Sequence, residues 1–244
     1  MQGLNIPTFR EIKLNSFRPL CMNELGQRAI TTYNFPPFID ASCRREPDFQ
    51  NPFPSISALC RQGKFAPHLR IGDIILYMTL QGHYSPYNEK HHRIVAILQV
   101  EEVYSTHQQG QIEYSKLKIA TPSNCMVNGN LPFDFDKTAG NFKTGKELKH
   151  FLMHNQQTQL TIGQRYLGHW DNNYLQKSQQ WTSFIRTKTL YKNLVDPVPV
   201  FRQDFEIIFG KLPNTRTPNR ISDKQFIELS KLIGLNVSLG AKFK

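Results

Sequence analysis

The chain has 244 residues, of which 39% are hydrophobic and 20% are charged. That apolar content suffices for a complete core, so disorder is not the default expectation, and no apolar run approaches the ~20 residues of a membrane span. Lysine and arginine outnumber the acidic residues and leave a net charge of +11, which favours a polyanionic partner such as nucleic acid. A soluble protein that is merely basic is the alternative. The N-terminus lacks the pattern of a signal peptide, so we expect a cytoplasmic protein.

The first third of the chain has only weak patterns of secondary structure, interrupted by prolines. Residues 1–27 show no clear period, and we expect an irregular lead-in there. The β-branched and aromatic run 29–33 predicts a strand, which Pro36 and Pro37 end. Ser55 is placed to cap a short helix.

The middle of the chain carries the clearest strand signals. Short apolar runs predict strands over 74–78 and 92–100. A turn over 108–111 leads into a third strand over 112–119. Residues 122–145 are expected to form a long loop.

Two capping boxes organise the C-terminal part. They begin at Thr144 and Ser222 and predict a helix after each, with Gly234 ending the second. Strands are expected over 182–191 and 205–209.

Strands at fairly even spacing, with few helices between them, favour an α+β fold. We expect a curled, mostly antiparallel sheet or small β-barrel with flanking helices. The sequence shows no internal repeat and no low-complexity linker. It therefore predicts a single domain over 1–244, with a core over about 29–130 and a C-terminal extension of helices and strands over about 144–244.

Two adjacent arginines are the sharpest chemical feature. Arg44 and Arg45 lie between Asp40 on one side and Glu46 and Asp48 on the other. Arginine offers planar, bidentate donors for a phosphate or a base edge, and the carboxylates could orient those donors. The alternative is a surface salt-bridge network, which contributes little to stability.

Cysteine and histidine give weaker signals. Cys43 adjoins the two arginines, which would favour its thiolate, and His91, His92 or His107 would have to serve as its base. The four cysteines contain no C-x-x-C pair, and their spacings with histidine match no zinc template. We therefore expect reduced thiols, no metal and no cofactor.

Three further residues are candidates for contact with a base. Asn124, in a polar turn, can hydrogen-bond a base edge or cap its own loop. Trp170 beside Asp171 can pair a stacking ring with an acceptor, or can be a core ring beside a helix cap. Tyr77, in the strand over 74–78, is a second candidate for stacking on a base.

A family resemblance rests on four segments: YNFPPFIDASCRREPDFQNPFPSISALCR, FAPHLRIGDIILYMT, HHRIVAILQVEEVY and PSNCMVNGN. They resemble a group of bacterial and phage domains called nucleotide modification associated domains, over about residues 29–130. The strand after Gly72-Asp73 and the next strand, which ends in Gln99-Val100-Glu101, also look like those of PUA-like barrels, which include EVE, YTH and ASCH domains. The resemblance implies a small barrel around a pocket, and several such domains bind a modified base flipped into that pocket.

We therefore expect a PUA-like domain that binds nucleic acid or a nucleotide, with DNA favoured over RNA, and that recognises or helps install a modified base. One alternative is an enzyme acting on a nucleobase or modified nucleotide. The other is an interaction subunit of a DNA modification or phage-defence system. The expected nucleotide-binding residues are Arg44, Arg45, Asp48, Tyr77, Asn124 and Trp170, with Cys43 as the catalytic candidate of the enzymatic alternative.

Overall fold

The computed structural model describes residues 2–22, 26–27, 30–31, 34–41, 46–122, 124–127 and 176–242. Its strands are β1 (Gln2–Phe9), β2 (Ile12–Phe17), β3 (Ser55–Ser57), β4 (Ile74–Thr79), β5 (His92–Tyr104), β6 (Phe184–Lys192), β7 (Val198–Val200), β8 (Asn219–Ile221) and β9 (Leu235–Lys242). The helices are α2 (His107–Lys116), α6 (Arg202–Phe209) and α7 (Asp223–Leu232), with short 3-10 helices η1 (Leu20–Met22), η2 (Cys60–Gly63) and η3 (Ala66–His68).

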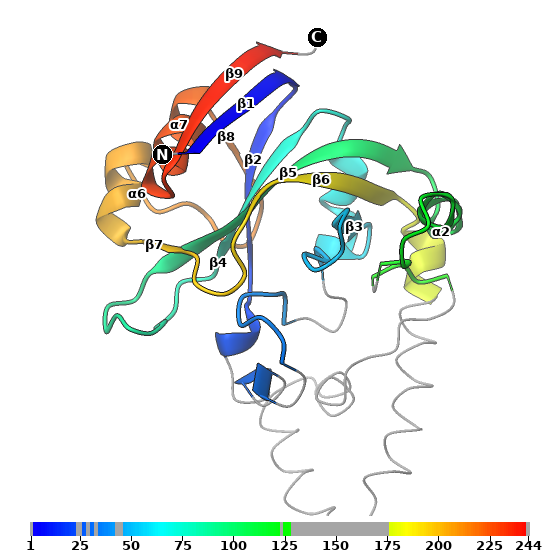
Figure 1. Cartoon of the computed structure of the whole chain (residues 1–244), viewed down its shortest axis with the longest axis horizontal. Coiled ribbons are helices and arrows are strands. Elements are labelled where there is room, and N and C mark those ends of the chain that lie inside the picture. Colours follow the sequence, from blue (N-terminus) through cyan, green and yellow to red (C-terminus); the bar gives the residue numbers. More distant parts are fainter. Residues whose placement is uncertain are drawn as a thin grey trace, which may run out of the picture.

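Seven strands form one mixed, mostly antiparallel sheet (Figure 1). Its order is β3-β6-β5-β4-β2-β8, and β7 pairs with β5. Only β2 and β4 run parallel in this sheet, while β1 and β9 form a separate parallel pair. The α+β class and the mostly antiparallel sheet are confirmed. Within the described residues the sheet is open, so these strands do not close the expected barrel.

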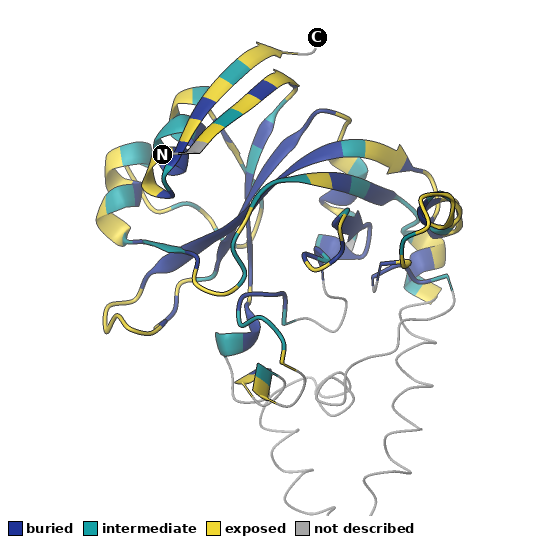
Figure 2. Cartoon of the chain, viewed as in Figure 1, coloured by how far each residue is buried: buried dark blue, intermediate teal, exposed yellow. Residues whose placement is uncertain are grey.

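The central strands bury both faces of the sheet. Residues of β4 alternate between two core clusters, because successive side chains of a strand point to opposite faces. Ile74 and Leu76 pack on one face with apolar residues of α6, α7 and the β1–β9 pair. Ile75 and Tyr77 pack on the other face with residues around η2 and η3. Figure 2 shows β4 and most of β5 as buried, as two covered faces require.

The strongest apolar and capping signals are confirmed. Strands occupy 74–79 and 184–192, and the strand predicted over 92–100 continues to Tyr104. Ser222 caps α7 by accepting a hydrogen bond from the Gln225 amide at 3.2 Å, and Gly234 follows with a φ of 75°. The helix expected after Thr144 lies outside the described residues.

Several weaker predictions are wrong. Residues 1–27 contain β1 and β2, and residues 30–31 are helical rather than extended. Ser55 begins strand β3 instead of capping a helix, because Ser57 pairs with β6. The segments predicted as a turn and strand over 108–119 and as a strand over 205–209 are largely helical, in α2 and α6.

Local capping explains these two helices. Thr106 accepts a hydrogen bond from the Gln109 amide at 3.1 Å, and the side of α2 bearing Gly110 and Tyr114 is buried. Asp204 accepts from the Phe201 amide at 2.8 Å at the start of α6. The main sheet also takes β6, β7 and β8 from beyond residue 180, so strands of the expected extension pair directly with those of the expected core.

Candidate functional site

The structure describes three of the expected site residues, and they lie in different places. These are Asp48, Tyr77 and Asn124. The others, Cys43, Arg44, Arg45 and Trp170, lie outside the described residues, and their roles stay predictions.

Asn124 is bound to its own chain on both sides of its amide. Its Oδ1 accepts from Ser55 Oγ at 2.5 Å, and its Nδ2 donates to the Ser55 carbonyl at 2.8 Å. Only 1% of the residue is exposed. This geometry favours the loop-capping interpretation over readout of a base.

Asp48 lines a small cavity of about 350 Å³ with Asp40 and Asn51. Its charge opposes the burial that lowers the pKa of Lys192. Tyr77 lines a different and larger cavity, and Asp40 contributes to both. The structure therefore places Asp48 and Tyr77 in neighbouring cavities rather than in one site.

The larger cavity, of about 1140 Å³, is the candidate site, and we call it the basic cavity. Five parts of the chain build it: residues 13–18 along β2, the pieces 40–41 and 46, residues 60–68 around η2 and η3, Tyr77 and Leu80 at the end of β4, and residues 215–220 leading into β8. Asp40, Ala41 and Glu46 thus border it from the described residues on either side of 42–45.

Positive charge dominates the lining of the basic cavity. Its cationic side chains are Lys13, Arg18, Arg61, Lys64, Arg216 and Arg220, and its acidic ones are Asp40 and Glu46. Lys13 is compensated by Asp73 at 2.6 Å, and Arg220 lies 3.2 Å from Glu11. Arg18, Lys64 and Arg216 are exposed, and none has a described carboxylate within ion-pair distance. Three cations are therefore available to an anion.

Arg61 ties two walls of the basic cavity together. Its φ is 55°, in the left-handed region that non-glycine residues rarely adopt. Nη2 donates to Asn15 Oδ1 at 3.0 Å, to the Ser16 carbonyl at 2.9 Å and to the Thr215 carbonyl at 3.2 Å. Nη1 donates to the carbonyl of Arg216. Backbone strain of this kind is typical of functional sites. The acceptors described for Arg61 are all neutral, so they do not compensate its positive charge.

Aromatic side chains form the apolar part of the lining. Phe17, Phe65 and Tyr77 contribute, and the Tyr77 ring packs edge-on against Phe49 with centroids 5.4 Å apart. The Tyr77 ring is 1% exposed, so stacking on a ligand would require it to move.

The hydroxyl of Tyr77 is the unusual atom of this lining. It is buried and has no hydrogen-bond partner among the described residues, and burial raises its pKa well above the ordinary value. Asn15, its neighbour across the parallel strands β2 and β4, counters that shift but does not meet hydrogen-bond geometry.

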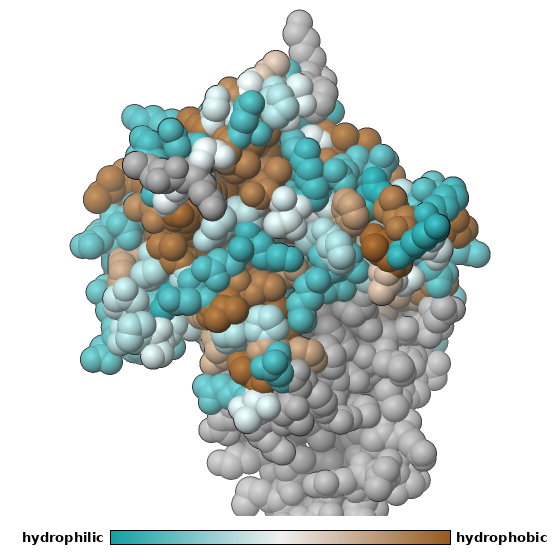
Figure 3. All heavy atoms as spheres, viewed as in Figure 1, coloured by the Kyte–Doolittle hydropathy of each residue, from teal (hydrophilic) through white to brown (hydrophobic). Residues whose placement is uncertain are grey.

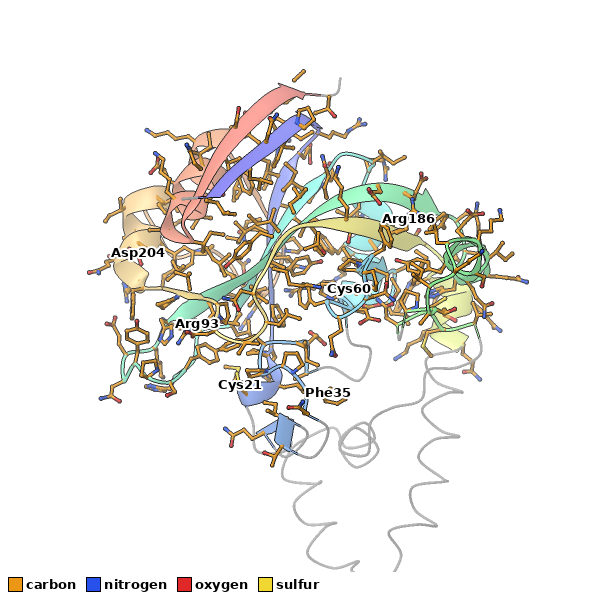
Figure 4. The ribbon with its side chains drawn as sticks, in the orientation of Figure 1. Cys21, Phe35, Cys60, Arg93, Arg186 and Asp204 are labelled. Atoms are coloured by element: carbon orange, nitrogen blue, oxygen red, sulfur yellow. The ribbon has the colours of Figure 1, made fainter. Side chains whose placement is uncertain are left out.

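Other expected groups serve the framework. His91 Nε2 accepts from Arg93 Nε at 2.9 Å, and His92 Nδ1 lies 2.8 Å from the Thr79 carbonyl. Burial lowers the pKa of both histidines. Figure 4 shows Arg93 near one end of the main sheet and Arg186, which lies 3.8 Å from Glu101, near the other. Arg186, Lys188 and Lys192, the basic residues of β6, do not line the basic cavity.

The described residues contain neither a candidate metal site nor a membrane-spanning helix. No group of three or more His, Cys, Asp or Glu side chains there could hold a metal ion. None of the described helices has the length and apolar character needed to cross a membrane. On the face shown in Figure 3, polar side chains are interspersed with apolar ones over the described part.

The sequence contained part of the signal for the basic cavity. Lysine and arginine cluster in the sequence over 61–70 and over 211–224, and the structure brings members of both clusters to one cavity. Lys13, Asn15 and Arg18 had no signal, because they fall in the segment expected to be irregular. Comparison with models of known protein families, with curated proteins and with solved structures gave no match to this chain.

Proposed function

We propose that this chain is a cytoplasmic nucleic-acid- or nucleotide-binding domain and that the basic cavity holds its ligand. The single observation that carries the proposal is the excess of six cationic over two acidic side chains in one cavity that also has aromatic walls. Basic grooves with aromatic side chains suit ligands that combine phosphate with a planar base. The resemblance to PUA-like domains and to nucleotide modification associated domains supports DNA and a modified base as the ligand class.

The dimensions of the basic cavity support a ligand of nucleotide size. Small-molecule pockets usually measure roughly 300–1,000 Å³, and this cavity of about 1140 Å³ slightly exceeds that range. Exposed Arg18, Lys64 and Arg216 would contact phosphate, while buried Asn15 offers a polar side chain to a base.

Salt-dependent binding tests the proposal. A fluorescently labelled 12-nucleotide DNA strand, with and without a modified base, is titrated with protein and followed by anisotropy at several salt concentrations. Counterion release makes log affinity fall with log salt by about 0.7 per phosphate contact for single strands. Binding that is absent at low salt, or that does not change with salt, would reject the proposal.

The double variant Arg18→Ala/Arg216→Ala tests the location of the site. Loss of two contacts lowers the affinity about 25-fold at 0.1 M salt, from the same slope of about 0.7 per contact. The matched control Lys116→Ala/Arg202→Ala removes the same charge from α2 and α6, where both side chains are 65% exposed and bridged to glutamates. The control should bind nearly as the wild type does. Equal losses in the two double variants would mean that only the net charge matters.

A further inference from the structure

A second basic depression lies beside the basic cavity. It measures about 540 Å³ and is lined by residues 10–12, residues 220–224 and Lys242. These segments are the turn between β1 and β2, the connection from β8 into α7, and the end of β9. Four cationic side chains face two acidic ones there: Arg10, Arg220, Lys224 and Lys242 against Glu11 and Asp223. We call it the side hollow.

Arg220 joins the side hollow to the basic cavity, because it lines both. It is the partner of Lys13 in the antiparallel pairing of β8 with β2. Glu11 lies between the two cations, with Oε1 3.2 Å from Arg220 and Oε2 3.3 Å from Lys13. This shared carboxylate fixes the border between the two depressions and holds a cation on each side of it.

Two cations of the side hollow are available to a ligand. Lys242 lies 2.7 Å from Asp223 and over the ring of Phe9, so its charge is already compensated. Arg10 and Lys224 are exposed, and neither has a described carboxylate within ion-pair distance. The side hollow therefore has two uncompensated positive charges that no interaction of the described fold uses.

We propose that the side hollow binds the phosphodiester backbone of a polynucleotide strand whose neighbouring nucleotide occupies the basic cavity. This inference rests on the proposed function and narrows its ligand from nucleotide to strand. A free mononucleotide needs one cationic site, whereas two adjoining sites joined by Arg220 suit successive phosphates of one chain. A base inside the basic cavity must be out of a duplex stack, so the strand is single or locally unpaired there.

The test compares ligand length in wild type and the double variant Arg10→Ala/Lys224→Ala. The probes are labelled thymidine monophosphate and single strands of three, six and twelve thymidine nucleotides, with a twelve-base-pair duplex as comparison. Wild-type affinity should rise from the mononucleotide to the longer strands. The double variant should lose about 25-fold for the longest strand at 0.1 M salt, with a salt slope shallower by about 1.4, and should keep the wild-type affinity for the mononucleotide.

The outcomes separate this inference from the proposed function. If the wild type binds none of the probes, the proposed function falls. If it binds them but Arg10→Ala/Lys224→Ala behaves like the control Lys116→Ala/Arg202→Ala, the side hollow is not a backbone site and the basic cavity stands alone. Equal loss for the mononucleotide and the long strand would overturn the inference too, because it would reveal a general charge effect. Tighter binding of the duplex than of the single strand would contradict the unpaired strand.

Discussion

Replacing Arg61 by glycine should lower the free energy of unfolding by about 2 kcal/mol. The two best-formed bonds of the guanidinium, to the Ser16 carbonyl at 2.9 Å and to Asn15 Oδ1 at 3.0 Å, contribute about 1.5 kcal/mol each. Glycine relieves about 1–2 kcal/mol of left-handed backbone strain, which stabilises the folded state. It also raises the entropy of the unfolded chain, which costs about 0.5–1 kcal/mol, so the net stabilisation from the backbone is about 1 kcal/mol. The lost bonds therefore outweigh the relieved strain.

Thermal and urea unfolding measure this difference. For a chain of 150–250 residues, about 2 kcal/mol corresponds to a fall in Tm of about 4–8 °C. Hydrogen exchange should also accelerate over residues 214–218, because Arg61 binds the carbonyls of Thr215 and Arg216. Arg61→Lys should be at least as destabilised, since it retains the strained backbone but loses the planar fork.

Lys118 supplies a matched control for the strain. Its φ is 57°, it is exposed, and it follows α2 without a side-chain network like that of Arg61. Lys118→Gly should therefore stabilise the protein by about 1 kcal/mol, the same net gain. Suppose instead that Lys118→Gly is stabilised in this way and Arg61→Gly is as stable as the wild type. The guanidinium bonds of Arg61 would then contribute no more than its backbone strain costs, which contradicts the expected loss of stability.

Three other substitutions test the packing, the titration and the unpaired hydroxyl. Gly110→Ala should cost about 1–3 kcal/mol in urea unfolding, because the new Cβ would lie 2.4 Å from a ring carbon of Phe184, whereas Gly3→Ala, with open space around it, should change little. Burial lowers the pKa of His107 to about 4, so the unfolded chain takes up the proton first as the pH falls below about 6.5. The free energy of unfolding of the wild type should therefore fall by about 3 kcal/mol by about pH 4.5. That of His107→Gln should fall clearly less over the same pH range. Tyr77→Phe should melt no lower than the wild type, because the hydroxyl has no partner, and a drop of several degrees would show that it has one.

The parts of the fold that could be predicted are those whose local signal needs no partner. The apolar runs that became β4 and β5 are buried on both faces, so any sheet containing them would use them as strands. The capping box at Ser222 and the glycine at 234 likewise act within a few residues.

The parts that failed depend on distant partners. Ser55–Ser57 is a strand because it pairs with β6, far along the chain. The segment after His107 alternates imperfectly, yet it is helical, with Tyr114 packed against Phe184 of that same strand. Short weak segments take their structure from tertiary contacts, which local propensity does not contain.

The candidate site was harder to predict than the fold, because its lining has no local pattern. Asn15 and Tyr77 become neighbours through the parallel pairing of β2 with β4, and Arg220 reaches the same cavity through the antiparallel pairing of β8 with β2. The sequence could show that lysine and arginine cluster over 61–70 and 211–224. It could not show that these clusters face each other.

The distribution of charge bears on whether the protein is generally basic or has a dedicated anion site. The basic cavity and the side hollow share Arg220 and together are lined by 28 different residues, of which nine are cationic and four acidic. Their excess of five positive charges is nearly half of the +11 of the whole chain, although they hold about a ninth of its 244 residues. Like charges repel across a concave surface, so this concentration costs stability unless an anion offsets it. A protein that is basic only for solubility would spread these charges apart, and their convergence on two adjoining depressions favours a polyanionic ligand.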